Sequence, residues 1–454
     1  MLKTEYNMQL YSTKNKSLKV DLQQAVFQGL PEDNGLFMPV DIPQLPAAFF
    51  QKLPGMSLPE IGFEVCQALI GDYIPSPDLR AIVEKAIDFP APIVQLDEQK
   101  YVLELWHGPS LAFKDFGARF MAQLMSYFNQ GASQDLVILV ATSGDTGGAV
   151  ASGFYQTPGI RVVILYPSGK VSLLQEKQLT TLGHNVTALE VNGTFDDCQA
   201  LVKQAFLDAD IRRRIRLSSA NSINIARLIP QAFYYFEAYR QLLVQQPAGN
   251  PVVFCVPSGN FGNLTAGLLA QRMGLPVRHF IAATNINDVI PAYLHTGNYQ
   301  PRPSHPTLSN AMDVGNPSNF VRMVDMYGAY EGDANLNEMT WQNMREQVSG
   351  YAFDDQKTAD AVREIDERYH YLMDPHGAVG YLALKDYQQQ HPHTRGVILE
   401  TAHPAKFLDD VERILGREID VPERLAELAN RPKEAVSMTT QYGDFRSWLE
   451  QYAG

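Results

Sequence analysis

The chain has 454 residues, of which 45% are hydrophobic and 19% are charged, so it has enough apolar residues for a large folded core. Its 37 Lys and Arg residues against 50 Asp and Glu residues give a net charge of −13, which argues against broad binding to nucleic acid or anionic membranes. The three cysteines are scattered and form no C-x-x-C pair, so neither a disulfide framework nor a structural zinc site is predicted.

Residues 1–20 are polar and contain no apolar core or small-residue cleavage site, so they do not resemble a secretory signal. The longest apolar runs, such as 136–141, are far shorter than the roughly 20 residues of a membrane span. We therefore expect a cytoplasmic protein without a membrane segment. The sequence leaves open whether the protein is a monomer or a homodimer.

Three helices are predicted in the N-terminal region 1–100, where Pro and Gly separate short periodic segments. At about 150 residues per domain, the length favours roughly three domains, and this mostly helical region is the first. The predicted helices cover 18–29, 58–70 and 79–87.

From residue 136 onward, short apolar runs rich in β-branched residues alternate with helical segments. This alternation is typical of parallel sheets covered by helices on both faces, and it predicts a doubly wound α/β fold. We expect a large domain of 101–132 and 218–454 and a small α/β domain of 133–217, with the site in the cleft between them. The expected strands are 136–141, 162–166, 188–191, 252–256, 277–283 and 397–399. The expected helices are 147–155, 173–182, 196–207, 225–243 and 264–273, and 297–319 is expected to be a surface loop.

Two loops with small, donor-rich residues each connect a predicted strand to a predicted helix. The first, 141–148, has the sequence ATSGDTGG, and the second, 257–263, has the sequence PSGNFGN. Such junctions hold ligands in parallel α/β sheets, because glycine lets the backbone approach and helix N-terminal amides bind negative oxygens. Neither loop is a P-loop or a G-x-G-x-x-G motif, and either alone could be a tight turn. Two of them favour a ligand with two anionic groups, or two ligands.

Lys114 stands in an apolar stretch, directly after Phe113. Burial lowers a lysine pKa, and a neutral amine can form a Schiff base with an aldehyde. The alternative is a lysine that extends from an amphipathic helix into solvent. Against it, Ser110 is expected to cap a helix that begins at Leu111 and is interrupted at Gly117, which places Lys114 where a helix disfavours a cation. A reactive lysine and a phosphate-sized cradle favour pyridoxal 5′-phosphate as cofactor.

Eight motifs, ordered along nearly the whole chain, resemble the threonine synthase family, in the longer branch found in many bacteria and in fungi. They are YST at 11–13, GLFMP at 35–39, HGPSLAFKD at 107–115, TSGDTG at 142–147, NSIN at 221–224 with Arg227, SGNFGN at 258–263, DPHGAVG at 374–380 and ETAHPAKF at 400–407. Ser110 and Gly377 stand where this family more commonly has Thr. The resemblance implies a fold-type II pyridoxal-phosphate enzyme with two open, doubly wound, mostly parallel sheet domains.

The resemblance also implies the cofactor site. Lys114 is expected to carry the cofactor and then to act as the general base at the substrate Cα. Thr401 is expected to bind the pyridine nitrogen, although it could instead cap a helix over 402–407. Asp145 is expected either near the ring hydroxyl or in a structural role. The cofactor phosphate is expected to lie against Gly259, Asn260, Phe261, Gly262 and Asn263.

The implied substrate is O-phospho-L-homoserine, and the implied reaction is γ-elimination of phosphate followed by addition of water at Cβ to give L-threonine. The substrate carboxylate is expected on Thr142, Ser143 and Thr146.

For the substrate phosphate, Ser222 is expected to cap a helix, which leaves Asn224 and Arg227 one turn apart and able to bind one anion. An exposed arginine on a helix face is the alternative. Lys406 and Arg119 are further candidate cations, or ion-pair partners.

Other functions stay open at this stage. With the same cofactor the chain could be a β-eliminating or β-replacing enzyme of the serine dehydratase or cysteine synthase type, or a lyase that gives 2-oxobutyrate from the same substrate. A non-catalytic nucleotide-binding protein is an alternative of a different class. The ten histidines show no metal-ligand spacing, so no catalytic metal is predicted, and His107 and His376 are expected to be structural.

Overall fold

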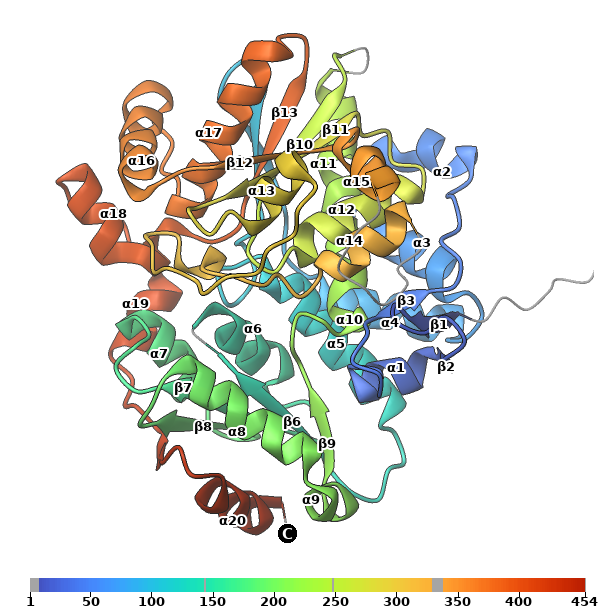
Figure 1. Cartoon of the computed structure of the whole chain (residues 1–454), viewed down its shortest axis with the longest axis vertical. Helices are drawn as coiled ribbons and strands as arrows, with labels where there is room; N and C mark the ends of the chain where they lie inside the picture. The colour runs from blue at the N-terminus through green and yellow to red at the C-terminus, as the bar shows by residue number, and fades with distance from the viewer. Residues whose placement is uncertain (1–7, 143, 247–248, 329–337, 454) are drawn as a thin grey trace, which may run out of the picture.

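The computed structural model describes residues 8–142, 144–246, 249–328 and 338–453. Two sheets with helices on their faces carry most of the chain, and the N-terminal elements pack beside the larger one (Figure 1). This arrangement confirms the predicted doubly wound α/β class. Among the described residues, no helix combines the length and the apolar character needed to cross a membrane.

The larger sheet has six strands in the order β12-β11-β10-β13-β5-β4. All neighbouring pairs are parallel except β4 with β5, and the central strands are buried along their whole length. This double-sided burial explains their nearly continuous apolar sequences. The strands are β4 (Ile93–Gln95), β5 (Lys100–Glu104), β10 (Val252–Pro257), β11 (His279–Thr284), β12 (Val348–Ala352) and β13 (Arg395–Glu400).

The smaller sheet has five parallel strands in the order β14-β8-β7-β6-β9. Its strands are β6 (Leu136–Ala141), β7 (Ile160–Pro167), β8 (Val186–Val191), β9 (Arg216–Ser219) and β14 (Val436–Met438). The expected small domain, 133–217, supplies nearly all of it. However, β14 returns from the C-terminal segment to pair with β8, and α20 (Tyr442–Ala453) packs its Phe445 and Leu449 into the same core. We therefore propose that 436–453 belongs to the small domain and not to the large one.

The N-terminal region is less purely helical than expected. It contains a three-stranded antiparallel sheet of β1 (Gln9–Ser12), β2 (Lys19–Asp21) and β3 (Phe37–Pro39). The first helix begins at Leu22 and not at residue 18, because Asp21 forms a capping box with Gln24 and ends the preceding strand. The other helices there are α2 (Ala47–Lys52), α3 (Leu58–Ile70) and α4 (Ser76–Ala86), and α3 has the expected bounds.

The helices predicted between 147 and 273 lie close to their predicted positions, whereas α9 and the helices after α12 were not predicted. Capping boxes at Ser172 and Thr194 fix the starts of α7 and α8. The expected helix 225–243 is divided into α10, a 3₁₀ turn and α11, because Pro230 interrupts regular helical bonding. The loop 297–319 is confirmed apart from a short 3₁₀ turn, Asn310–Met312. The helices are α5 (Lys114–Phe128), α6 (Asp145–Phe154), α7 (Leu173–Thr180), α8 (Phe195–Leu207), α9 (Ala209–Arg214), α10 (Ile225–Leu228), α11 (Phe233–Gln245), α12 (Gly262–Arg272), α13 (Val289–Thr296), α14 (Phe320–Tyr327), α15 (Glu338–Arg345), α16 (Asp355–Tyr369), α17 (Pro375–Gln390), α18 (Leu408–Leu415) and α19 (Glu423–Ala429).

Candidate active site

Lys114 is the first residue of α5, at the end of the loop that follows β5. The helix therefore begins three residues later than expected, and Ser110 does not cap it. The loop turns sharply at Leu111, which has the left-handed φ of 57°, an uncommon and costly conformation for leucine. Gly117 does not interrupt α5, and a Cβ there would lie 2.8 Å from the Arg227 carbonyl oxygen. The glycine thus lets α10 pack closely on the helix that carries Lys114.

The Lys114 amine makes no hydrogen bond or ion pair with any described residue. Burial lowers its pKa from 10.5 to about 8, with Asp145 raising it and the nearby Lys406 and Arg227 lowering it further. At neutral to mildly basic pH a useful fraction of this amine is therefore uncharged. The lowered pKa agrees with the effect expected from the apolar neighbours of Lys114 in the sequence.

Asp145 lies at the start of α6 and pairs with Lys406 at 2.7 Å, with both side chains almost fully buried. The same oxygen accepts a bond from Gln175. Burial by itself raises the pKa of Asp145, but Lys406 and Lys114 outweigh it and hold that pKa well below its usual range. Lys406 therefore serves here as an ion-pair partner, and Asp145 stays ionised next to Lys114.

The loop after β10 forms a cradle of amide groups at the start of α12. The backbone N–H groups of Gly259 to Asn263 have no acceptor among the described residues. The turn passes through Phe261 at φ 60°, and the Asn263 side chain holds it by accepting from Ser258 Oγ and donating to the Pro257 carbonyl. Asn263 thus offers its backbone amide, and not its side chain, to a ligand. Asn260 is exposed, and its side chain accepts from Ser318.

Thr401 follows β13, the neighbour of β10 in the sheet, so it lies beside the amide cradle. Its carbonyl accepts a hydrogen bond from the Phe113 N–H at 2.8 Å, which places it next to Lys114. Its hydroxyl has no partner among the described residues. His403, and not Thr401, caps the following 3₁₀ turn, so the helix-cap alternative for Thr401 is wrong.

The loop 141–148 is held together by Thr142, whose hydroxyl accepts from the N–H groups of Gly144 and Gly147. Because Thr142 is also buried, its hydroxyl supports the loop and is not free for a substrate. Thr146 is partly exposed on the first turn of α6, with no side-chain partner among the described residues. Ser143 lies outside the described residues.

The segment around Arg227 differs from the expected two-residue anion site. Asn224, not Ser222, caps α10, and its amide group donates to the Val26 carbonyl, so both ends of its side chain are engaged. Arg227 is buried and donates to the Ala220 carbonyl at 2.6 Å, and burial lowers its pKa to about 10. The backbone uses one N–H and the oxygen of the Asn224 amide, which disfavours a joint Asn224–Arg227 site but leaves it a prediction. Ser222 has no side-chain partner among the described residues.

Sequence reasoning missed the role of Asp115. This carboxyl is fully buried next to Lys114, its Oδ2 accepts from the Ser110 N–H at 2.8 Å, and its Oδ1 has no partner among the described residues. Burial raises the pKa of Asp115 to about 6. Gly108 makes this possible, since a Cβ there would lie 2.4 Å from Asp115 Oδ2. The apolar flanks of the motif hinted at burial, but not at the loop that folds onto the carboxyl.

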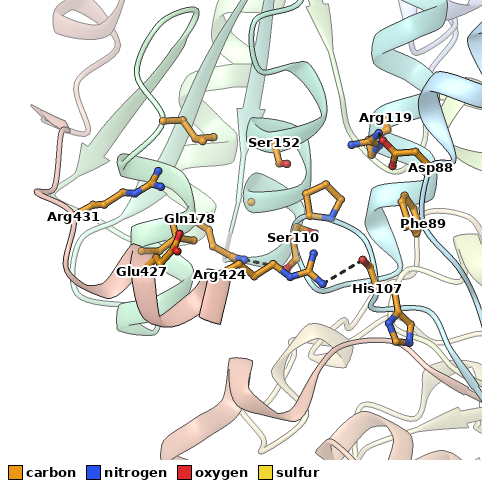
Figure 2. Close-up of a pocket in the computed structure, with 14 residues that line it drawn as sticks. Asp88, Phe89, His107, Ser110, Arg119, Ser152, Gln178, Arg424, Glu427 and Arg431 are labelled. Carbon is orange, nitrogen blue, oxygen red and sulfur yellow. Dashed lines mark hydrogen bonds and ion pairs between the residues drawn. The ribbon is translucent and has the colours of Figure 1, made fainter. Parts of the chain in front are cut away.

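A cavity of about 490 Å³ lies on the outer side of the lysine loop, between α6, α7 and α19 (Figure 2). Figure 2 shows Arg424 of α19 extending to the backbone of this loop, where it donates to the carbonyls of His107 and Gly108. Neither Lys114 nor the amide cradle lines this cavity. Arg119 borders it and pairs with Asp88, so Arg119 is not part of the site around Lys114.

The histidines of the site motifs have structural partners. His107 bonds to Glu104 at 2.7 Å, and His376 lies between Asp374 and the Ala311 N–H. Among the described residues, no group of His, Cys, Asp and Glu is arranged to hold a metal ion.

Three free groups at adjacent strand ends match the reactive parts of pyridoxal phosphate. The Lys114 amine suits the aldehyde, the amides of Gly259–Asn263 suit the phosphate, and the Thr401 hydroxyl suits the ring nitrogen. A Cβ at Gly259 would lie 2.6 Å from the Ala311 carbonyl oxygen, so the turn fits only without a side chain at this position. The residues present therefore fit this cofactor.

Comparisons with known proteins agree along the whole chain. Three family profiles match it: Threonine synthase N terminus over residues 9–87, Pyridoxal-phosphate dependent enzyme over 87–401, and Threonine synthase, C-terminal over 377–447. A threonine synthase of Escherichia coli (strain K12) is 45% identical over 97% of this chain and 99% of its own length. A crystal structure of threonine synthase from Escherichia coli, 45% identical, has a TM-score of 0.88, and the match covers 98% of this chain and 100% of that chain. A pyridoxal-phosphate-bound threonine synthase from Brucella melitensis, 34% identical with the same coverage, has a TM-score of 0.93.

Proposed function

The chain belongs to the threonine synthase family of pyridoxal-phosphate enzymes, and we propose that it converts O-phospho-L-homoserine and water into L-threonine and phosphate at the site around Lys114. The observation that carries this proposal is the partly buried Lys114 amine, which has no hydrogen-bond or ion-pair partner among the described residues, beside a cradle of amides that are likewise free there. When bound, pyridoxal phosphate withdraws electrons from the substrate carbons, which makes their protons removable.

We propose that Lys114 carries the cofactor and, once the substrate has displaced it, moves protons at the substrate Cα. Its pKa of about 8 suits this task, because an effective base has a pKa close to the working pH. The ionised Asp145 lies close enough to stabilise the charged form of the amine after it has taken up a proton. The amides of Gly259–Asn263 would hold the cofactor phosphate, and Thr401 would bind the ring nitrogen without adding charge.

The substrate has two anionic ends, and we propose a separate binding place for each of them, one at α6 and one at α10. We propose that the first turn of α6, with the Thr146 hydroxyl, binds the carboxylate, because a helix start favours negative charge. For the phosphate we propose Arg227 with Ser222. This assignment is supported by the position of Arg227, which is close enough to Lys114 to lower the pKa of the lysine. We assign Asn224 only the role of holding α10 in place through the Val26 carbonyl.

The reaction is tested by incubating the holoenzyme with O-phospho-L-homoserine and measuring phosphate, threonine and 2-oxobutyrate together. We expect equal amounts of phosphate and threonine. Phosphate with 2-oxobutyrate but no threonine would instead identify a lyase, and release of none of the three would contradict the proposal. Lys114→Ala should abolish turnover, by a factor of about 10³ or more, because it removes both the cofactor anchor and the base.

We propose that the small molecule is the enzyme's main partner and that nucleic acid is not one, which the net charge of −13 supports. We also propose that the enzyme works in the cytoplasm. The three cysteines Cys66, Cys198 and Cys255 are free thiols, which is the usual state in a reducing compartment.

A further inference from the structure

Three buried carboxyl groups lie at neighbouring ends of the large-domain sheet. Glu104 ends β5, Glu400 ends β13, and Asp374 caps the start of α17. Glu400 and Asp374 are wholly inaccessible to solvent, and Glu400 directly precedes Thr401. Three ionised carboxylates buried side by side would destabilise the folded protein. The hydrogen-bond partners of each group therefore indicate which one keeps its proton.

The hydrogen bonds of each carboxyl oxygen show which oxygens lack a donor. Asp374 Oδ1 accepts from the backbone N–H of His376 at 2.7 Å and from its ring Nδ1 at 2.5 Å. Glu400 Oε1 accepts from the Asp374 N–H at 2.8 Å. The second oxygens, Asp374 Oδ2 and Glu400 Oε2, have no partner among the described residues, and the bond from the Asp374 N–H to Glu400 Oε1 makes the two carboxyl groups neighbours. One shared proton would give a partner to both oxygens at once.

The surroundings of the two carboxyl groups indicate which of them is protonated. Asp374 accepts two hydrogen bonds at Oδ1 at the start of a 16-residue helix, so its free acceptor is Oδ2. Burial raises the pKa of Glu400 well above its usual range, and the neighbouring Asp374 and Glu104 raise it further. Glu104 is itself committed to His107 and to the Tyr371 hydroxyl.

We propose that Glu400 is a neutral carboxylic acid that donates its proton to Asp374, and that this pair is a positioning device for Thr401. The backbone supports the second part. The Glu400 carbonyl accepts from the Leu105 N–H at 3.0 Å, and the Thr401 carbonyl accepts from the Phe113 N–H at 2.8 Å. Fixing the Glu400 side chain therefore fixes the peptide that leads into Thr401, next to the loop that carries Lys114. The role at Thr401 rests on the proposed function, whereas the acid pair does not.

Gly377 provides independent support from packing. It lies in the first turn of α17, and a Cβ built on it would lie only 1.7 Å from Glu400 Oε2. No side chain larger than hydrogen fits there while Glu400 holds its position. The missing side chain at position 377 therefore leaves the space that the Glu400 carboxyl fills, and it makes residues 377 and 400 a coupled pair.

The first test uses infrared spectroscopy of the holoenzyme at pH 8, where a protonated carboxylic acid has its own C=O stretch. The difference spectrum between the natural enzyme and Glu400→Gln should contain this band. Glu364→Gln, which alters a partly exposed acid in a surface ion pair, serves as the matched control and should leave the band unchanged. If the spectrum of the natural enzyme contains no carboxylic-acid band that disappears in Glu400→Gln, the proposed acid pair is wrong.

The second test is a double-mutant cycle on urea unfolding with Gly377→Ala and Glu400→Ala. Gly377→Ala alone should lower the midpoint of unfolding clearly. In the Glu400→Ala background, Gly377→Ala should lower the free energy of unfolding much less, because the added methyl group then fills the space left by the carboxyl. Equal costs in both backgrounds would overturn the coupling of positions 377 and 400.

The positioning role is tested by pyridoxal-phosphate affinity and the absorption maximum of the bound cofactor. Glu400→Gln keeps a neutral donor toward Asp374, so its pyridoxal-phosphate affinity should stay within twofold of the natural enzyme and its absorption maximum should not move. Glu400→Ala removes the donor, so it should weaken pyridoxal-phosphate binding at least fivefold and shift the absorption maximum. Equal behaviour of the two variants would overturn the link to Thr401. None of these measurements uses the substrate, so a failed turnover assay and a failed acid-pair test remain distinguishable.

Discussion

Lys114 owes its reactivity to three neighbours as well as to burial. Loss of solvent lowers its pKa, Asp145 opposes this, and Lys406 and Arg227 assist it. Since Lys406 also holds Asp145 through a buried ion pair, one cation controls two of these effects. Lys406 is thus well placed to tune the amine without contacting it.

We predict that Lys406→Met raises the pKa of Lys114 from about 8 by roughly one unit. The change removes a repelling cation and leaves the Asp145 carboxylate facing Lys114 more strongly. The rate at which the apoenzyme takes up pyridoxal phosphate, followed by absorbance against pH, should shift to higher pH. Lys385→Met, at a surface pair with Glu364, is the control and should leave the profile in place. A profile of Lys406→Met that matches the control would refute this role.

The buried carboxyl of Asp115 also links the site to pH. Its folded pKa of about 6 lies above the ordinary value of 3.8, so the folded protein holds this proton more tightly than the unfolded chain. The associated stability is complete below pH 3.8 and is lost as the pH rises towards 6.

We predict that Asp115→Asn removes this dependence, because asparagine can still accept from the Ser110 N–H but does not titrate. The free energy of unfolding of the natural enzyme, relative to this variant, should fall by at most about 3 kcal/mol between pH 4 and pH 7. Urea unfolding at several pH values measures it. A constant difference over this range would mean that Asp115 does not titrate as described.

At the scale of elements, the site depends on two turns that place a non-glycine residue at positive φ. Leu111 turns the loop before α5, and Phe261 turns the loop before α12. α12 begins directly after Phe261 and α5 three residues after Leu111, so each costly backbone conformation lies just before a helix start of the site. The sequence indicated the second loop by its glycines and the first by the apolar neighbours of Lys114, but it did not show that bulky residues take the strained positions.

We predict that Gly259→Ala weakens pyridoxal-phosphate binding about tenfold or more, because its Cβ would lie 2.6 Å from the Ala311 carbonyl and 3.0 Å from Met312 Cα. Both neighbours are backbone atoms, so the cradle itself must shift, at a cost of about 1–3 kcal/mol. Fluorescence titration of the apoenzyme measures the affinity. Gly443→Ala, where a Cβ meets no atom within 4 Å, should bind normally. Equal affinity of the two variants would argue against a tight cradle.

At the scale of the whole molecule, the C-terminal segment joins the two domains. After β13 the chain passes through Lys406 and Arg424, which bind the lysine loop through its carbonyl groups, and then adds β14 and α20 to the small sheet. Lys406 also bonds to Asp145 of the small domain. The lysine loop is therefore fixed from both domains at once.

We predict that Phe445→Ala in α20 destabilises the small domain by about 3–5 kcal/mol, because it empties a buried place beside Leu449 in that core. Thermal unfolding followed by circular dichroism measures the loss. Gln451→Ala, on the exposed side of the same helix, should have almost no effect. A small effect of Phe445→Ala would show that α20 does not complete the small-domain core.

The net charge of −13 does not conflict with anionic ligands, because the site collects its own cations and amides. Lys114, Lys406 and Arg227 lie close together against Asp115 and Asp145, and neutral N–H groups supply the rest. Buried charges and helix starts act over short distances in a medium of low polarity, whereas surface acids are screened by water and salt. Local arrangement therefore outweighs total charge.

The sequence by itself determined the fold class, the places of six strands and of most helices up to residue 273, and the donor-rich loops at strand ends. These follow from local patterns: apolar runs of strand length, glycine after a strand, and a lysine with apolar neighbours. Only the tertiary structure decided which polar groups remain free. Asn224 is occupied by Val26, Asp145 by Lys406, and Gly377 makes room for Glu400. Each of these contacts joins residues more than twenty positions apart, so its partner is set by how the elements pack and not by any pattern along the chain.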